Sequence, residues 1–456
     1  MGNHRDIYHQ CLAVIPVCLL EFAIALACGW LGPMIKIFLE DPNSEIKATE
    51  EECSWIASMP GFGRIFGPFF SILLLDVLGR KVMIQITAAI FAALWLPILF
   101  TRSVGILCIS FFFCGLGIGI CNGLTAVYIG ENCSPKIRGI LCSASVTSFY
   151  LAVLMQYTIA GYLSYSTLAT VNFILAFCGL ISCIFLTVET AQFLMLKGRF
   201  DKAESNMMWL RGTENKHDII TDFENIKANV ASEKLKKTSY RELFFAPANF
   251  KSLIIVLTLN MAHAATGNIA LFTYISVLFP ENAHFTSNQV TVYYGISQMT
   301  FCLLASFVIE KVNRRSLTLF AFSLFLVCHS VSAYFFYDAA NSESPSKYGF
   351  WIIFTMVCLF CGFSAVLDSV VHMIRGELFP QSIKPIGSGL AIATHSLAQF
   401  FTVKIFLMIK SQYGIYMNFV GYAVGSVAAF WFTYFFLPET RGKTLIEIQK
   451  SLEKRK

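Results

Sequence analysis

Two charged side chains lie inside long apolar runs, where a charge needs a partner. Glu21 and Arg64 each belong to a run of the length that crosses a bilayer, roughly 20 residues. An unpaired charge at that depth costs at least about 2.5–3.5 kcal/mol. The first run leads away from the N-terminal side and the second returns, so both charges lie near mid-depth. We therefore expect an ion pair between them, which is either structural or able to exchange a proton in one state.

A second set of charges forms a pattern that occurs twice. Asp76-Val-Leu-Gly79-Arg80-Lys81 is echoed by Glu310-Lys-Val-Asn313-Arg314-Arg315, and the two acids are 310 − 76 = 234 positions apart. Glycine and asparagine tolerate a left-handed backbone at a tight turn. The acid is expected to end one helix, and the basic pair to open the next. A matched copy points to an internal duplication.

Two further patterns repeat at a similar offset. Glu131 and Arg138 are seven positions apart, as are Glu377 and Lys384, and these pairs are related by 377 − 131 = 246 positions. Val188-Glu-Thr is echoed by Pro438-Glu-Thr. All of these charges fall at the ends of apolar runs, on the same side of the predicted membrane. The full set is Asp76, Arg80, Glu131, Arg138, Glu189, Glu310, Arg314, Glu377, Lys384 and Glu439.

The composition excludes a soluble domain. Of the 456 residues, 56% are hydrophobic and 14% are charged, and the mean hydropathy is +0.64. Soluble domains carry about 25% charged residues. The net charge of +6 comes from basic residues in short connectors, so we expect no nucleic-acid partner. No nucleotide-binding loop, nucleophile elbow or metal-ligand spacing is present, so we expect neither an enzyme nor a cofactor.

Twelve apolar runs are long enough to span a bilayer, which predicts an all-α membrane protein. The polar stretch 189–249 divides them into an N-terminal half, 1–188, and a C-terminal half, 250–438, followed by a tail, 439–456. Short amphipathic helices are expected in the polar stretch. The predicted spans are 11–33, 54–76, 82–101, 104–128, 140–162, 167–188, 250–279, 288–310, 316–337, 349–374, 386–409 and 414–438.

The distribution of basic residues predicts the orientation. The connectors that carry the repeated charges are rich in Lys and Arg, whereas the loop after the first run is mostly acidic and 280–287 has no Lys or Arg. By the positive-inside rule both termini lie in the cytoplasm. We expect a multi-pass protein of the plasma membrane that works as a monomer, with the lipid bilayer and a small solute as its partners.

The repeated motifs resemble the signatures of the sugar porter family within the major facilitator superfamily. The resemblance covers nearly the whole chain. The proline four places after Glu131, Pro135, resembles the pattern of the insect trehalose-transporter branch. It implies a twelve-helix bundle of two pseudo-symmetric halves. It also implies facilitated diffusion of a sugar, either trehalose or a hexose, by alternating access. The repeated charges would form ion pairs that hold the outward-facing state. One departure is Ile72, where the family usually has glycine.

The same resemblance implies where solute binds, although these positions differ from the family pattern. Gln298 stands at the position of one family Asn, and Asn268 lies next to the position of a second family Asn. His263, His372 and His395 replace residues that are amides or a tryptophan in the family. Polar groups and aromatic faces suit a ligand rich in hydroxyl groups. The expected substrate-binding residues are therefore His263, Asn268, Gln298, His372 and His395.

The changed positions leave several alternatives open. The three histidines are expected to line a polar cavity or to pack singly. A metal site is less favoured, because three separate helices provide no short spacing to set its geometry. Asp368 and His372 share a helix face and are expected to hydrogen-bond. The solute need not be a sugar, transport could be coupled to protons, and a non-transporting sensor is a third class. The short tail of 456 − 438 = 18 residues argues against the sensor.

Overall fold

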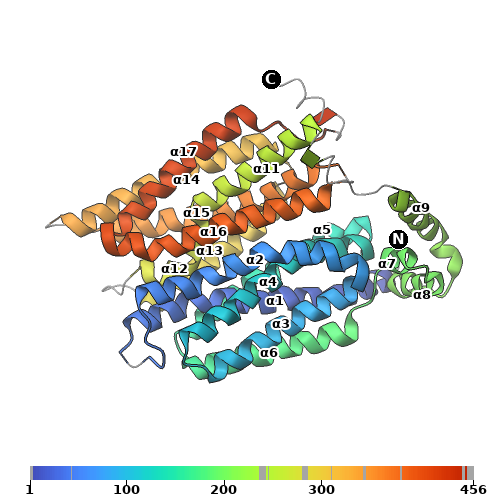
Figure 1. Ribbon diagram of the computed structural model, residues 1–456, viewed down its shortest axis with the longest axis horizontal. Coiled ribbons are helices and arrows are strands. Elements are labelled where there is room, and N and C mark those ends of the chain that lie inside the picture. The colour runs from blue at the N-terminus through green and yellow to red at the C-terminus, as the bar shows by residue number, and fades with distance from the viewer. Residues whose placement is uncertain are drawn as a thin grey trace.

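The described chain is a bundle of long helices (Figure 1). The structure, a computed structural model, describes residues 4–42, 44–235, 243–244, 246–279, 286–309, 311–342, 346–380, 383–443 and 447–448. Glu310, one of the repeated charges, and most of the tail 439–456 lie outside the described residues. The first bundle consists of α1 (His4–Glu40), α2 (Glu50–Leu78), α3 (Arg80–Phe100), α4 (Val104–Asn132), α5 (Pro135–Ala160) and α6 (Tyr165–Leu186).

The second bundle follows a group of short helices. That group lies beyond one end of the molecule, close to the N-terminus (Figure 1). It consists of α7 (Ala191–Leu196), α8 (Phe200–Arg211), a 3₁₀ turn (Lys216–Asp218) and α9 (Ile220–Leu235). The second bundle consists of α11 (Pro247–Ala265), α12 (Asn268–Leu278), α13 (Ser287–Val308), α14 (Arg314–Asn341), α15 (Gly349–Leu378), α16 (Lys384–Tyr413) and α17 (Ile415–Phe436).

The predicted spans correspond closely to these helices. Eleven segments of the described chain are long and apolar enough to cross a membrane, with α11 and α12 counted together. The helix at the place of the predicted eighth span, α13, is not among the eleven, and it packs against α5 and α15. The repeated charges lie at one end of the bundles, which we call the motif end. The loop 41–49 lies at the other, which we call the far end.

Local sequence explains where several helices start. Thr49 and Glu52 form a capping box at α2, in which each side chain accepts from the other's backbone amide, at 3.2 and 2.9 Å. Gly79 separates α2 from α3 with φ +93°, a left-handed value that suits glycine. The repeat differs here, because Asn313 before α14 has φ −65° and ψ 133°. The left-handed turn predicted at Asn313 is therefore wrong, and an extended residue is enough to start that helix.

Glycines bring α2 and α4 unusually close together. A Cβ at Gly63 would lie 1.9 Å from the Phe112 carbonyl oxygen, and one at Gly67 would lie 2.4 Å from the Cα of Gly119. Small residues are the usual means of close helix contact in membranes. At Ile72, where the motif resemblance leads us to expect glycine, the side chain instead meets a glycine of the other bundle. A Cβ at Gly389 would lie 2.8 Å from Ile72 Cδ1.

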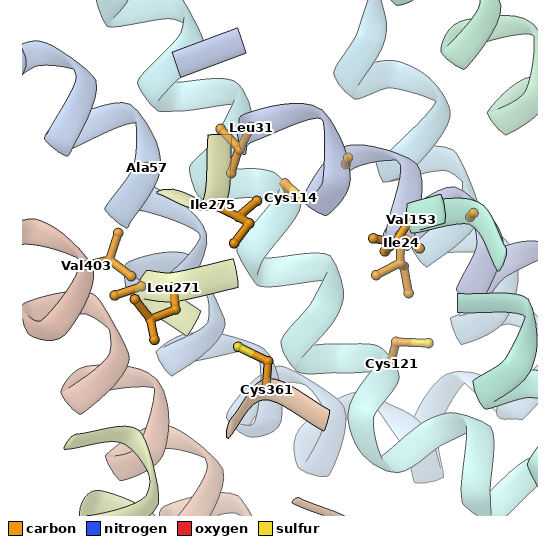
Figure 2. Packing of buried hydrophobic residues seen from close by; sticks show 14 of the residues in the cluster. Ile24, Leu31, Ala57, Cys114, Cys121, Val153, Leu271, Ile275, Cys361 and Val403 are labelled. Carbon is orange, nitrogen blue, oxygen red and sulfur yellow. The ribbon is translucent and has the colours of Figure 1, made fainter. Parts of the chain in front are cut away.

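The two bundles meet through an apolar core. Helix α2 packs against α16, and α1 packs against α12. Figure 2 shows Leu271 and Ile275 of α12 in this region, together with Val403 of α16 and Ala57 of α2. All four side chains are buried. This core holds together the helices that carry the polar residues described below.

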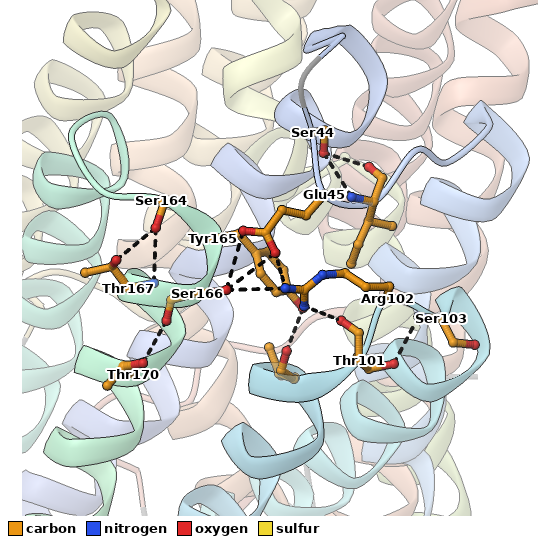
Figure 3. Close-up of polar contacts among 12 residues, drawn as sticks. Ser44, Glu45, Thr101, Arg102, Ser103, Ser164, Tyr165, Ser166, Thr167 and Thr170 are labelled. Atoms are coloured by element: carbon orange, nitrogen blue, oxygen red, sulfur yellow. Dashed lines mark hydrogen bonds and ion pairs between the residues drawn. The ribbon is translucent and has the colours of Figure 1, made fainter.

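A polar cluster ties the far-end loop to the first bundle (Figure 3). Arg102 forms an ion pair with Glu45, and its guanidinium lies over the ring of Tyr165, 5.3 Å from the centroid. Ser166 donates to the Glu45 carboxylate at 3.4 Å, and Tyr165 donates to the Ile98 carbonyl at 2.8 Å. The cluster therefore connects the loop before α2 with the α3–α4 turn and the start of α6.

Candidate functional site

A cavity of about 430 Å³ lies between the two bundles. Its volume falls within the range of roughly 300–1,000 Å³ typical of small-molecule sites. Both bundles contribute to its walls, and apolar side chains form most of the surface around a smaller number of polar groups. The polar residues that line it include Glu21, Arg64, Asn122, Thr125, Asn268, Gln298, Ser364, Asp368, His395 and Gln399.

The cavity reaches further toward the motif end than toward the far end. Its lining includes Ile129 and Cys142, which lie near the motif ends of α4 and α5. At the far end the bundles contact each other. The Lys404 ammonium of α16 donates to Ser54 Oγ of α2 at 2.7 Å and lies 3.9 Å from the centroid of the Trp55 ring. These contacts join α2 and α16 at the far end in this conformation.

Arg64 connects the two bundles in the cavity wall. Its Nη1 donates to Gln399 Oε1 of α16 at 3.2 Å. The amide of Asn122 on α4 satisfies its hydrogen bonds when its oxygen faces the guanidinium, and it then accepts from Nε and Nη2, both at 2.9 Å. The arginine is therefore held by two neutral amides, and its positive charge remains available to the cavity.

His395 extends this connection into the second bundle. Its Nδ1 lies 2.9 Å from the Asn260 carbonyl oxygen, which can only accept, so Nδ1 carries the proton. The Nε2 lone pair then accepts from the Gln399 amide at 2.8 Å. A continuous chain of hydrogen bonds therefore runs from α11 through α16 to Arg64 on α2.

His263 lies behind the cavity surface. It is 0% exposed and is not among the lining residues. Its Nε2 lies 3.1 Å from Ser364 Oγ and 3.4 Å from Asn268 Nδ2, whereas Ser364 and Asn268 themselves line the cavity. The break between α11 and α12 puts these groups together, because Gly267 adopts φ +82° and starts the second segment at Asn268. His263 therefore supports the cavity wall instead of facing a solute directly.

The other predicted solute-binding residues are placed as follows. Gln298 lines the cavity and donates to the hydroxyl of buried Tyr294 at 3.0 Å. His372 is not among the lining residues, and its side chain is 40% exposed. The Asp368 carboxylate does line the cavity and lies between two histidines, 3.7 Å from His372 Nε2 and 3.8 Å from His263 Nδ1. Both distances are longer than a hydrogen bond, so the predicted hydrogen bond between Asp368 and His372 is not formed in this conformation.

Glu21 and Arg64 do not form the predicted ion pair. Glu21 accepts from Thr125 Oγ1 of α4 at 2.8 Å and from Cys121 Sγ at 3.6 Å. Both charges line the cavity and their depths agree with the prediction, but no ion pair joins them within the described residues. The reason is rotation about the helix axes. Glu21 faces one side of α4, whereas Arg64 faces Asn122 and α16.

Four repeated charges of the first bundle, Asp76, Arg80, Glu131 and Glu189, meet at the motif end. Arg80 forms ion pairs with Asp76 at 3.3 Å and with Glu131 at 3.0 Å. Glu189 comes from the segment after α6 and accepts from the backbone amides of Arg80 and Lys81, at 3.0 and 3.2 Å. It therefore caps the start of α3, where a negative charge is favourable. Burial raises the pKa of the Glu189 carboxyl, and these amide hydrogen bonds act in the opposite direction.

The second bundle repeats this arrangement. Arg314 lies 3.7 Å from Glu377. Glu439 accepts from the backbone amides of Arg314 and Arg315, at 3.0 and 3.1 Å, and so caps α14 as Glu189 caps α3. The sequence repeat thus corresponds to a structural repeat, although the capping role of the two glutamates could not be read from their spacing. All of these contacts stay within one bundle.

Arg138 and Lys384 occupy less connected positions. Arg138 donates to the Cys133 carbonyl at 3.2 Å, and among the described residues no ion pair joins it to the other repeated charges. Lys384 is the first residue of α16 and likewise forms no ion pair there. Their predicted part in the charge network is not seen in this conformation. Glu310 lies outside the described residues.

Sequence reasoning missed several polar residues of the site. Gln399 carried a detectable signal, because it lies four residues after His395 and so shares its helix face. Asn122, Thr125 and Ser364 carried none, because polar residues of this size are common on membrane helices. Their roles follow only from the partners that tertiary packing provides.

Comparison with known proteins identifies the family. A family model described as "Sugar (and other) transporter" matches residues 14–452. The chain belongs to this family. The facilitated trehalose transporter Tret1 of Polypedilum vanderplanki is 25% identical over 99% of this chain and 89% of its own length. Tret1 of Aedes aegypti is 24% identical over 99% of this chain, which spans 56% of that longer protein.

A solved structure confirms the fold. An inward-open structure of the xylose transporter XylE from E. coli superimposes with a TM-score of 0.77 at 18% identity, covering 98% of this chain and 99% of that one. The predicted all-α membrane fold of the major facilitator superfamily is therefore correct. The chain is therefore a multi-pass membrane protein, and the family to which it belongs consists of transporters, which are not enzymes.

Proposed function

We propose that this transporter moves a small sugar, trehalose or a hexose, through the central cavity by alternating access and facilitated diffusion. The cavity itself is the observation that carries the proposal. It is large enough for a small solute, it is lined by both bundles, and amide and hydroxyl groups are spread among its apolar side chains. Such a lining can exchange hydrogen bonds with a sugar while apolar side chains contact the faces of its ring.

The contacts between the bundles support alternating access. In this conformation the far end is closed through Lys404 and Ser54, while the cavity extends to Ile129 and Cys142 near the motif end. The ion pairs and amide contacts described above for the repeated charges each join partners of the same bundle. In the opposite conformation the motif ends approach, and Arg138 and Lys384 then gain acidic partners across the gap. The charges thereby favour that second conformation.

The proposal places the protein in the plasma membrane with the motif end and both termini in the cytoplasm. The basic residues of the motif end support this orientation through the positive-inside rule. The cavity then faces the cytoplasm in the conformation described here. The protein works as a monomer, because one chain contains the whole cavity.

Uptake of radiolabelled trehalose and glucose into oocytes tests the proposal. The expected result is saturable uptake that is independent of a proton gradient. Gln298→Ala removes a cavity amide and should raise the KM for sugar. Gln85→Ala is the matched control, because that amide contacts backbone carbonyls of Cys183 and Ile184 on α6, outside the cavity. Absence of uptake by protein shown to be at the cell surface would refute the sugar as substrate.

A proton-coupled mechanism is the second candidate, and one carboxyl group favours it. Glu21 lines the cavity, and its described partners, Thr125 and Cys121, are uncharged. A carboxyl group that water reaches in one conformation only can carry a proton across. Under this mechanism uptake rises when the outside is acidified, and Glu21→Gln abolishes that rise. Uptake that is flat with external pH in the wild type would exclude the candidate.

A further inference from the structure

Three potential metal ligands converge in the second bundle. His263 of α11, Asp368 of α15 and His395 of α16 each present one ligand atom, and these atoms all lie within 4.8 Å of one another. The three residues are far apart in sequence, so only the packing of three helices brings them together. We propose that they form a binding site for a transition-metal dication such as Zn²⁺ in the wall of the cavity.

The buried imidazole of His263 points to a missing partner. Its side chain is fully buried, and its Nδ1 has no hydrogen-bond partner although Asp368 Oδ1 is only 3.8 Å away. In the tautomer with the proton on Nε2, Nε2–H donates to Ser364 Oγ at 3.1 Å, and the longer 3.4 Å contact from Asn268 Nδ2 to the same nitrogen is then not a hydrogen bond. Nδ1 then presents its lone pair toward the carboxylate. A metal-bound histidine has this arrangement, with one nitrogen as ligand and the other donating to a fixed acceptor.

His395 is prepared in the same way. Its Nδ1–H donates to the Asn260 carbonyl at 2.9 Å, which holds the ring and leaves the Nε2 lone pair for a ligand. The rings of His263 and His395 lie near each other, with centroids 5.5 Å apart. Both rings are therefore oriented by a neighbouring hydrogen bond, as the outer partners of a metal site orient its ligands.

The type of donor selects the class of ion. Two imidazole nitrogens and one carboxylate oxygen suit Zn²⁺ and its neighbours in the first transition row, whereas Mg²⁺ and Ca²⁺ prefer oxygen ligands. Zinc binds these donors at about 2.0–2.2 Å in a tetrahedron, so the ligand atoms must approach one another by roughly 1 Å or somewhat more through side-chain rotation. Asp368 lines the cavity, so a fourth position on the ion can hold water or solute.

Binding at His395 would also reach the contact between the bundles. The Nε2 lone pair accepts from the Gln399 amide at 2.8 Å, and that amide in turn accepts from Arg64 of α2 at 3.2 Å. An ion on Nε2 displaces the Gln399 amide group. The ion therefore competes with the hydrogen-bond chain that connects α16 to α2, and it links metal binding to the arrangement of the two bundles.

Metal titration of the purified full chain in detergent tests the site without requiring transport. Co²⁺ is the spectroscopic probe, since its visible absorption reports nitrogen and oxygen ligands, and Zn²⁺ competition gives the affinity. We expect one Co²⁺ per chain. Asp368→Asn and His395→Gln should each weaken Co²⁺ binding by at least about 10–100-fold. That is the typical loss when a residue that only hydrogen-bonds to a metal ligand is replaced. His217→Ala is the control, because that histidine lies in the exposed 3₁₀ turn between α8 and α9.

The outcomes separate a real site from surface binding. Absence of stoichiometric Co²⁺ binding, or full retention of binding in either ligand variant, would overturn the proposal. Loss of binding in His217→Ala would assign the ion to the surface instead. If a ligand variant fails to elute as a monodisperse protein, X-ray absorption of Co²⁺ on the wild type decides, because the proposed site requires two imidazoles in the coordination shell.

Discussion

The contact between α2 and α4 allows a prediction with a matched control on the same helix. Gly119 and Gly123 lie one turn apart on α4. A Cβ at Gly119 would lie 2.8 Å from the Arg64 carbonyl oxygen and 2.8 Å from the Cα of Gly67, whereas nothing lies within 4 Å of a Cβ at Gly123. The change from Gly to Ala therefore meets backbone at one position and open space at the other.

The expected magnitude follows from these distances. Ordinary contact begins at 3.4 Å, so Gly119→Ala must move one helix by at least 3.4 − 2.8 = 0.6 Å. The gain in helix propensity, about 1 kcal/mol, is common to both variants and cancels in their comparison. The remaining difference is the cost of overpacking, about 1–3 kcal/mol. Gly119→Ala should therefore be less stable than Gly123→Ala by that amount.

Sugar uptake should rank the two glycine variants in the same order as their stability. A shift of α2 from α4 separates Arg64 from Asn122, so Gly119→Ala should also lower sugar uptake, and Gly123→Ala should not. Unfolding free energy is measured by SDS titration of the purified protein, and uptake is normalised to surface expression. Equal stability and equal uptake in the two variants would refute the close α2–α4 contact as a support of the site.

Further predictions concern the two ends of the molecule. Glu189→Gln and Glu439→Gln should each lower the unfolding free energy by about 1.5–3 kcal/mol, because each removes a charged acceptor of backbone amides. Glu204→Gln, in a surface pair with a lysine, should change it by less than about 1 kcal/mol, and SDS titration compares the three. Equal losses of unfolding free energy in all three variants would contradict the capping role of Glu189 and Glu439. Lys404→Met removes the far-end contacts and should speed maleimide labelling of buried Cys53, followed by mass spectrometry. An unchanged rate would mean that Lys404 does not hold the far end closed.

The sequence alone was sufficient for the fold class and for the repeated motifs. The bilayer admits only helices and closed β-barrels, and apolar runs of about 20 residues have the length of a spanning helix, so composition along the chain nearly determines the helices. The repeated charges were also visible, because a duplicated segment retains its spacing. The local backbone was less certain, since the predicted left-handed turn was found at Gly79 but not at Asn313.

The site depended on tertiary structure. Depth in the membrane placed Glu21 and Arg64 at the same level, but only the rotation of their helices decided that Glu21 meets Thr125 and Arg64 meets Gln399. Likewise, His263 could be assigned to the centre of the molecule, but not to a position behind the cavity wall.

The physical reason is that a helix has a known length but an undetermined rotation about its axis. Hydrophobic periodicity sets this rotation well on the surface of a soluble protein, but membrane helices are apolar on nearly all sides, so the pattern is weak. Rotation is then decided by contacts such as the α2–α4 glycines and by caps such as Glu189 on α3, from a segment more than a hundred positions away. Sequence determined which helices exist, and their packing decided which side chains meet.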